Sequence, residues 1–224
     1  MRSRTTRIVM LAVIFALATS VIGFAQPCGV ANQITCLDWD GSGNLFASQN
    51  DTNGFGNFAT VYQQFTLPTG TSLWDVESFH FVGGYFNIGP PPLVSAFTLN
   101  LFLNDNGGAP GTQIATGFFT SFNEQLLGGQ IYSYDLYFQS FDMAPGTYWA
   151  SVVPDLGFPP QWGWATATGG TGTGGYQCFF GTCGATGTDF AFAVDGRAIP
   201  EPGTLIMLGT GILGLAGSLR RKLF

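Results

Sequence analysis

Basic residues are almost absent from the interior of this 224-residue chain. Six of the seven Lys and Arg residues lie within residues 2–7 and 220–222, and Arg197 is the one base between Gln26 and Ile199. The same interval holds twelve of the thirteen acidic residues, so one base against twelve acids gives it a formal charge of −11. Nucleic acids and anionic lipid surfaces are bound through clustered Lys and Arg. The interior therefore excludes nucleic-acid binding and repels anionic surfaces.

Residues suited to acid–base catalysis are also scarce. The chain has one histidine, His80, and spacing singles out no Ser or Cys nucleophile near it, so we expect a partly buried or rim imidazole on a strand. Asp75 and Glu77 lie two residues apart on an expected strand and so face the same side. Such a pair could serve a retaining glycosidase, or it could simply belong to a solvated face of the sheet. No acid–base or nucleophile set stands out, and we predict that the chain is not an enzyme.

Amphipathic helical patterns of ten or more residues are absent, and short aromatic and β-branched runs take their place. Gly, Pro and Asn clusters separate these runs, as at residues 104–111, which is typical of strands joined by turns. One clear alternation is Phe97, Leu99, Leu101 and Leu103, which share one face. The pattern predicts strands at Thr60–Leu67, Leu73–Val82, Ala96–Leu103, Gln113–Thr120, Gln130–Phe138, Thr147–Val153, Gln161–Ala167, Tyr176–Phe180 and Asp189–Asp195.

Many short strands at close spacing predict an all-β fold, a β-sandwich of jelly-roll type, over residues 58–198. Residues 26–57 precede it as a segment that contains a disulfide. The cysteines are Cys28, Cys36, Cys178 and Cys183, an even number behind an export signal, which favours two disulfides. Among the three connectivities we expect the local pairs, 28 with 36 and 178 with 183. A four-cysteine zinc site is the alternative, although no CxxC pair is present.

The first 25 residues have the three parts of a secretory signal peptide. Arg2, Arg4 and Arg7 form a basic start, residues 8–22 are apolar, and small residues stand at the expected cleavage site before Gln26. An uncleaved membrane anchor is the alternative. The signal predicts export, with the Sec translocon and signal peptidase as transient partners.

The last 26 residues form a second distinct segment. Pro200-Glu201-Pro202 is followed by an apolar run over residues 203–219 and by Arg220-Arg221-Lys222. As a helix the run would reach roughly 25 Å, close to the thickness of a bilayer core. It is apolar on every face, which argues against a core helix of a soluble domain. We predict a single transmembrane helix that leaves the domain outside the cytoplasm by the positive-inside rule.

This tail resembles the PEP-CTERM sorting signal in its Pro-Glu-Pro, its Gly- and Leu-rich span and its basic cluster. The resemblance implies processing by exosortase, a membrane-embedded cysteine transpeptidase, and transfer to the cell surface or the medium. Proteins of that family occur in Gram-negative bacteria that make extracellular polysaccharide and biofilm. Residues 55–198 also resemble, more loosely, the small sandwich domains that are common on exported bacterial proteins. The tail predicts where the protein goes and is silent on what the domain binds.

Two segments of the exported part are candidate binding sites. Asp38, Asp40 and Ser42 occupy positions 1, 3 and 5 of a calcium-loop pattern with Gly41 and Gly43 between and after them, although Gln49 replaces the usual Glu at position 12. The alternative is an Asx-rich turn. Trp162 and Trp164 share one face of an expected strand, where they could stack on sugar rings or could fill the core.

We therefore predict an exosortase-sorted cell-envelope or matrix protein with a non-catalytic domain. A structural or adhesion role in an exopolysaccharide or biofilm setting is the first hypothesis. The second is a carbohydrate-binding module for a neutral glycan, or for an acidic glycan bridged by calcium, because a domain charge of −11 repels acidic polymers. No cofactor other than this calcium is expected.

Overall fold

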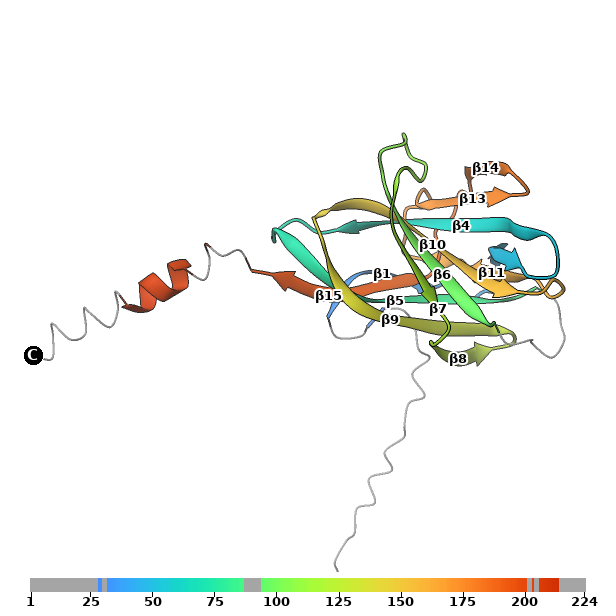
Figure 1. The fold of residues 1–224 in the computed structure, drawn as a ribbon, viewed down its shortest axis with the longest axis horizontal. Helices are drawn as coiled ribbons and strands as arrows, with labels where there is room; N and C mark the ends of the chain where they lie inside the picture. The colour runs from blue at the N-terminus through green and yellow to red at the C-terminus, as the bar shows by residue number, and fades with distance from the viewer. Residues whose placement is uncertain (1–27, 30–31, 87–93, 201–202, 204–205, 214–224) are drawn as a thin grey trace, which may run out of the picture.

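The computed structural model describes residues 28–29, 32–86, 94–200, 203 and 206–213 (Figure 1). The predicted signal peptide at residues 1–25 lies outside the described residues. So do most of the sorting residues, Glu201, Pro202, Arg220, Arg221 and Lys222. The described chain is built from strands, apart from a short helix at 206–213, and the predicted all-β class is confirmed.

The strands form two sheets. The first, eight-stranded sheet contains β1 (Gln33–Trp39), β2 (Leu45–Ala47), β5 (Leu73–Tyr85), β8 (Asn123–Gly128), β9 (Ile131–Met143), β11 (Trp162–Ala165), β12 (Ala167–Thr168) and β15 (Phe192–Ile199). The second, seven-stranded sheet contains β3 (Gln49–Asp51), β4 (Gly56–Leu67), β6 (Ala96–Leu103), β7 (Gln113–Phe119), β10 (Gly146–Leu156), β13 (Gly175–Phe179) and β14 (Thr182–Ala185).

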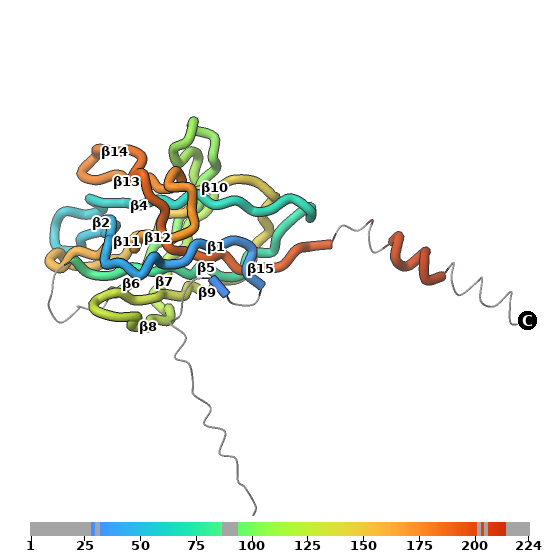
Figure 2. The backbone as a smooth tube through the Cα atoms, turned by 180° about the vertical axis from the view of Figure 1, so that it is seen from behind, coloured from blue at the N-terminus to red at the C-terminus, as the bar shows by residue number. Residues whose placement is uncertain are grey.

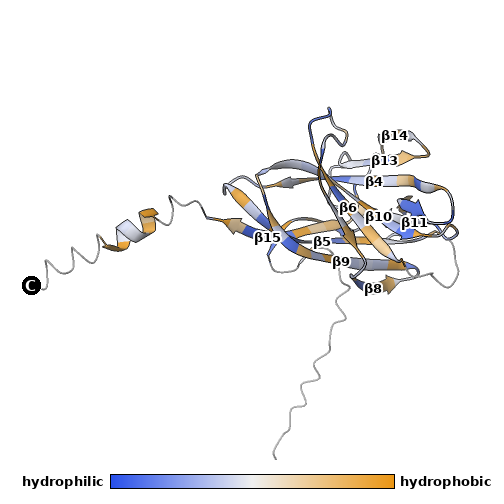
Figure 3. Cartoon of the chain, viewed as in Figure 1, coloured by the Kyte–Doolittle hydropathy of each residue, from blue (hydrophilic) through white to orange (hydrophobic). Residues whose placement is uncertain are grey.

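The long strand β5 organises the first sheet. It pairs antiparallel with β15 on one side and with β9 on the other, and its last residues pair with β11. In the second sheet the order is β14-β13-β4-β3-β10-β6-β7, so β14 and β7 are its two edges. Hydrophobic and hydrophilic residues are interleaved along β6, β9 and β15 (Figure 3), as expected for strands with one face in the core.

One aromatic-rich core joins the two sheets. Phe79 and Phe81 of β5 and Trp162 of β11 come from the first sheet, and Phe97 of β6 and Tyr148 of β10 come from the second. The Phe81 and Phe97 rings lie 5.1 Å apart between the sheets. Two sheets that share a core in this way form a sandwich. The jelly-roll topology stays a prediction.

All nine predicted strands are present, but their bounds differ. Ala96–Leu103 matches β6, whereas β9 and β10 run several residues beyond their predicted ends. The predicted strand Gln161–Ala167 is divided into β11 and β12. Five strands were not predicted: β1, β2, β3, β8 and β14. Three of these, β2, β3 and β14, have four residues or fewer and show no strand pattern in their sequence. They are held by pairing with β11, β4 and β13, respectively.

Within the segment predicted at 26–57, the described residues from Gln33 onward belong to the sandwich. β1 pairs with β15 and β12, β2 pairs with β11, and β3 pairs with β4 and β10. The sandwich therefore begins at Gln33, earlier in the chain than the predicted start at Phe58. Asn, Asp and Gly are frequent in this segment, which weakens the strand pattern until its partners in the fold are known.

Both predicted disulfides are present, Cys28–Cys36 and Cys178–Cys183, so the zinc alternative is wrong. The second bond joins directly opposite residues of the β13–β14 hairpin. Each closes a short ring, which stabilises the fold by about 2 kcal/mol in the chain-entropy view.

The C-terminal helix at 206–213 lies beyond the end of β15 and apart from the sheets (Figure 2). Within the part of the chain that the structure describes, no helix has the length and apolar character needed to cross a bilayer. The predicted transmembrane run at 203–219 extends past the described residues, so the membrane helix stays a prediction.

Candidate functional site

The sorting tail joins the sandwich with almost no spacer. β15 remains paired with β5 up to Ile199, which lies opposite Leu73, and Pro200 follows at once. The Thr71 hydroxyl donates a hydrogen bond to the Ile199 carbonyl oxygen at 2.7 Å. The first residue of the sorting segment is thus held at the end of the domain.

Close to this junction the predicted carboxylate pair has a structural role. Arg197 of β15 donates from Nε to Glu77 Oε1 at 2.8 Å. The register of β5 against both β9 and β15 skips Glu77, so this residue lies in a bulge. Arg197 lies opposite Asp75 in the pairing of β15 with β5, and the charges of Glu77 and Asp75 both raise the pKa of this guanidinium. The pair therefore belongs to a solvated, ion-paired face, which is the alternative to the glycosidase interpretation.

Trp162 and Trp164 do not form a sugar platform. Both side chains are fully buried, with 0% exposure. Trp162 packs against Phe81, Phe97 and Tyr134. Trp164 donates from Nε1 to the Ala191 carbonyl oxygen at 2.8 Å. The predicted glycan-binding role of these two residues is wrong, because the alternation of β11 turns both rings into the core.

The predicted calcium loop is a hydrogen-bonded turn. One carboxylate oxygen of Asp40 accepts from the Ser42 backbone N–H at 2.8 Å, and the other accepts from the Thr166 hydroxyl at 2.5 Å. Asp38 accepts from the Cys28 N–H at 2.9 Å. Burial acts to raise the pKa of Asp40, but the bonds from Thr166 and Ser42 outweigh it and lower the pKa. This arrangement matches the Asx-turn alternative, and no cluster of three or more His, Cys, Asp or Glu suited to a metal occurs among the described residues.

On the outer face of the first sheet, a hydrogen-bond network connects His80 with side chains from three strands. His80 Nδ1 lies 2.7 Å from Asp135 Oδ1 of β9, and Nε2 lies 2.7 Å from Asp195 Oδ2 of β15. The Ser78 hydroxyl lies 3.0 Å from Nε2 and donates to the same Asp195 oxygen at 3.2 Å. The expectation of a partly buried imidazole is confirmed, because His80 is 9% exposed. The expectation that it has no Ser neighbour is wrong.

Ser78, His80 and Asp135 have the contacts of a nucleophile–base–acid triad, but the second carboxylate changes their chemistry. Burial acts to lower the pKa of His80, yet the hydrogen bonds and charges of Asp135 and Asp195 outweigh it and raise the pKa to about 9. Near neutral pH the ring is therefore an imidazolium that donates from both nitrogens. A general base needs a free lone pair facing the nucleophile. The group is arranged as an ion-paired network across three strands.

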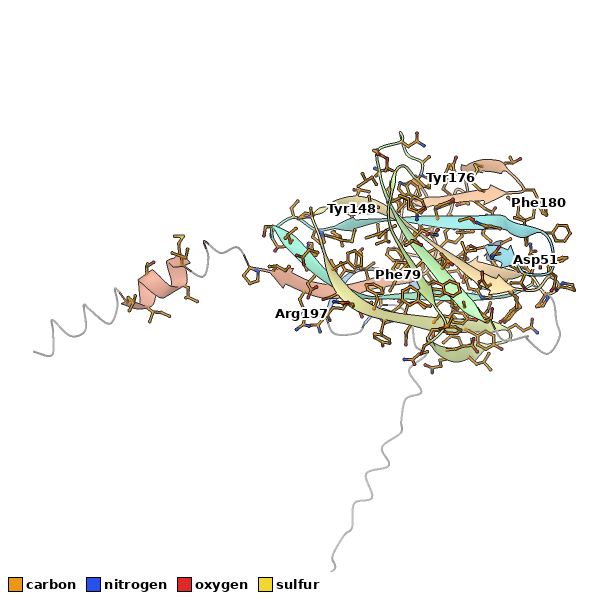
Figure 4. All side chains as sticks on the ribbon, viewed as in Figure 1. Asp51, Phe79, Tyr148, Tyr176, Phe180 and Arg197 are labelled. Carbon is orange, nitrogen blue, oxygen red and sulfur yellow. A yellow bond between two sulfur atoms is a disulfide. The ribbon has the colours of Figure 1, made fainter. Side chains whose placement is uncertain are left out.

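A cluster of phenylalanines forms one end of the domain, opposite the sorting tail. Phe55 and Phe180 are 62% and 61% exposed, and their ring centroids lie 6.1 Å apart. Phe158 and Phe179 are also exposed, and Phe58 lies beneath them. Figure 4 shows Phe180 and Asp51 at this end and Arg197 toward the other. We call these five residues the phenylalanine tip.

The tip is held by a buried carboxylate and by a strained turn. Asp51 accepts hydrogen bonds from the backbone N–H groups of Phe158 at 2.7 Å and Phe55 at 2.8 Å, and these bonds lower its pKa. Phe180 and Gly181 form the two-residue turn of the β13–β14 hairpin, and both have positive φ, 46° and 82°. Asn or Gly usually occupies the first of these positions. A bulky aromatic residue is strained at this position, and its ring is exposed.

An open cleft of about 490 Å³ lies between the Asp40 turn and the β8–β9 turn. Trp39 and Phe86 line it, and Trp39 is oriented by a bond from Nε1 to the Ser42 carbonyl oxygen at 2.8 Å. Gly43 and Gly128 also line the cleft, and a Cβ atom at either would meet nothing within 4 Å. Neither has the positive φ that requires glycine. The bare backbone at these positions leaves room for a ligand beside the two aromatic rings.

The fold and its tail define a class of protein, an all-β domain that carries a C-terminal sorting segment. The family model of the PEP-CTERM protein-sorting motif matches residues 198–222, so the chain carries this motif directly behind β15. The motif implies an exported protein with exosortase as its processing partner. No curated protein sequence matches the chain.

Proposed function

We propose that this protein is exported, released from its tail by exosortase, and used at the cell surface as a non-catalytic adhesion or matrix component. The sorting motif at 198–222 carries the first part of this proposal. The phenylalanine tip supports the second part. An exopolysaccharide or biofilm setting is the context in which we place it.

The non-catalytic part rests on the chemistry of the described side chains. The one histidine is held as an imidazolium by two carboxylates. Glu77 is paired with Arg197, and the four cysteines are bonded. Asp51 and Asp40 accept bonds from N–H and O–H donors. Each of these groups thus has a structural partner.

Adhesion through the phenylalanine tip follows from its composition. Three loops that are far apart in sequence bring aromatic rings to one end, and Asp51, the one acidic residue among them, is buried. The exposed fractions of four rings together correspond to roughly 400 Å² of aromatic surface. Apolar patches of this size on a monomer are often functional. The tip would therefore hold apolar, uncharged material while the rest of the domain repels anionic polymers.

The cleft beside Trp39 favours a second candidate function, the binding of a neutral sugar. An oriented indole and a neighbouring Phe86 are suited to stacking on a sugar ring. The near absence of basic residues in the domain argues for a neutral ligand.

Processing can be tested by the intact mass of the protein recovered from the cell surface or medium of the native host. We expect a mature form that lacks residues 1–25 and the segment beyond the Pro-Glu-Pro site. A variant with Ala at positions 200, 201 and 202 should retain the tail and accumulate in the membrane fraction. Arg197→Gln, just outside the matched motif, is the control and should be processed normally. Surface-exposed wild-type protein that still ends at Phe224 would contradict the proposal.

The two surfaces can be separated by paired variants. Phe55→Ser with Phe180→Asn removes exposed rings, and Asn suits the left-handed turn at 180, so the fold should be kept. We expect this pair to weaken retention on an alkyl-coated surface by about tenfold or more, since two partly exposed aromatic side chains are lost. Trp39→Ala serves as the matched control and should retain normal adsorption.

The same two variants are then tested on immobilised dextran, a neutral polysaccharide, with thermal unfolding as a check on the fold. If Trp39→Ala removes dextran binding while the Phe55→Ser, Phe180→Asn protein keeps it, sugar binding at the cleft replaces adhesion as the proposed function. If neither variant differs from wild type on either surface, both functions are wrong.

A further inference from the structure

The strand β7 forms a free edge of the second sheet. Its pairing partner is β6, and no other described strand pairs with it. Figure 1 shows β7 at the near side of the domain, crossing in front of β6 and β10. The side of β7 away from β6 therefore presents backbone N–H and C=O groups that no described strand binds.

Edge strands are usually protected, and this one is protected only by a bulge near its start. Protection comes from short length, charged side chains, proline or bulges. The other edges follow this rule: β12, β2 and β14 have two to four residues, and β8 carries Glu124. β7 has seven residues with neither a charge nor a proline. One bulge lies near its start, where the pairing with Leu101 and Phe102 shifts, and the ladder is regular from Ala115 to Phe119.

Apolar side chains lie on both faces of the β7 edge. Phe118 on the outer face is 62% exposed, and Ile114, which lies in the bulge, is 45% exposed. On the inner face, Ala115 and Phe119 line an apolar groove of about 300 Å³ between β7 and β9. A strand added to this edge would therefore gain hydrogen bonds from the backbone and would cover apolar surface on either side.

The edge is self-complementary. A two-fold axis at Thr116 pairs two antiparallel β7 strands so that Ala115 of each copy lies opposite the partner's Gly117, and Phe118 of each copy comes beside the bulge at the partner's Ile114. Aromatic and β-branched residues form favourable cross-strand pairs. Because the rest of the domain carries a net charge of −11, two copies repel each other at most contacts. The neutral β7 edge is a place where they can meet without opposing like charges.

We propose that β7 is a self-association site, at which two copies pair β7 antiparallel about Thr116 and join their second sheets. This inference is independent of sorting and of the ligand surfaces above. The contact centres on two seven-residue strands and falls below the roughly 1,200 Å² of typical stable complexes. A weak dimer is therefore expected, favoured where many copies are crowded on one surface.

Cross-linking tests both the contact and its register. All four native cysteines are in disulfides, so a cysteine introduced on β7 is the single free thiol. In full-length protein exported to an oxidising compartment, Thr116→Cys should give a disulfide dimer on mild oxidation, because directly opposite residues lie within disulfide reach. Gln113→Cys is the control on the same strand. Its two copies would lie roughly 20 Å apart and should not cross-link.

A second variant tests the association without a cysteine. Thr116 is exposed and its hydroxyl donates a surface hydrogen bond to Asn100, so Thr116→Lys should lower the unfolding temperature only slightly while placing two like charges on the axis. We expect the concentration-dependent dimer seen by sedimentation to be lost. Equal cross-linking of both cysteine variants, no cross-linking of either, or a wild-type monomer at high concentration would overturn the proposal. Protection of the thiol in monomeric Thr116→Cys protein from a small thiol reagent would also overturn it, since another part of the chain would then cover the edge.

Discussion

His80→Ala is expected to lower the free energy of unfolding at pH 6 by about 3 kcal/mol, as is usual when one partner of a buried ion pair is removed. His80 donates to carboxylates on two neighbouring strands, at 2.7 Å each. Without the imidazolium, Asp135 and Asp195 lose the cation that lies between them, and Asp195 keeps the hydrogen bond from the Ser78 hydroxyl. Asp195 Oδ1 is already buried without a hydrogen-bond partner, so this carboxylate has little to replace the lost bond. Chemical denaturation of the two proteins measures the difference.

The same network predicts how stability depends on pH. The pKa of His80 is raised from 6.5 in the unfolded chain to about 9 in the folded protein. A raised pKa means that the folded state holds its proton more tightly, so the stabilisation is complete below pH 6.5 and is lost as the pH rises through 9. A difference of this size corresponds to about 3 kcal/mol. The chain has one histidine and its cysteines are bonded, so no other side chain is expected to titrate in this window.

His80→Gln provides the matched control, because it keeps a side-chain donor and does not titrate. Its unfolding free energy should be nearly flat between pH 6 and 9.5, where wild type declines. A wild-type profile as flat as that of His80→Gln would show that the imidazolium does not hold the three strands together. An increase in wild-type stability over this range would contradict the sign of the effect.

Trp162→Ala should destabilise the fold by about 3–5 kcal/mol, which is a large part of the stability of a typical domain. The side chain has 0% exposure and packs against rings from both sheets, with Phe97 at 5.7 Å and Tyr134 at 6.0 Å between centroids. Its ring also covers Gly83, where an added Cβ would lie 2.0 Å from Trp162 Cζ2. Truncation leaves a cavity that this closely packed backbone cannot fill.

Two comparisons make this result diagnostic. Trp162→Phe should cost clearly less, because much of the ring volume is kept. Trp39→Ala, at the rim of the cleft, should cost less than Trp162→Ala because Trp39 is only partly buried. A Trp162→Ala protein that unfolds like wild type but no longer binds a glycan would contradict this prediction. It would show that Trp162 binds sugar at the surface.

The features that are set by residues close together in the chain could be predicted from the sequence. The alternation of apolar residues in Ala96–Leu103 gave the bounds of β6, because one face of that strand lies in the core and the other does not. The two local disulfides also followed, because cysteines five and eight residues apart can meet only through a turn or a short loop. Strands β1, β2 and β3 were missed, because partners far along the chain hold them and their own composition is weak for strands.

The candidate sites depended on long-range neighbours and were less predictable. Trp162 and Trp164 were correctly placed on one face of a strand, but the sequence does not say which face meets the other sheet. The His80 network left one local trace, Ser78 two residues before His80 on the same side of β5. Its carboxylates lie 55 and 115 residues away and reach the ring only through the register of β9 and β15. The phenylalanine tip likewise joins three loops that share no local pattern.

By itself the sequence determined the export tail, the acidic character of the interior and the all-β class, because each depends on composition or on residues close together in the chain. Tertiary structure alone decided which aromatic residues are buried, which carboxylates surround His80, and which strand edge is left open. Those properties follow from the pairing order of strands and from which sheet face meets the core, and neither is encoded in any short stretch of residues.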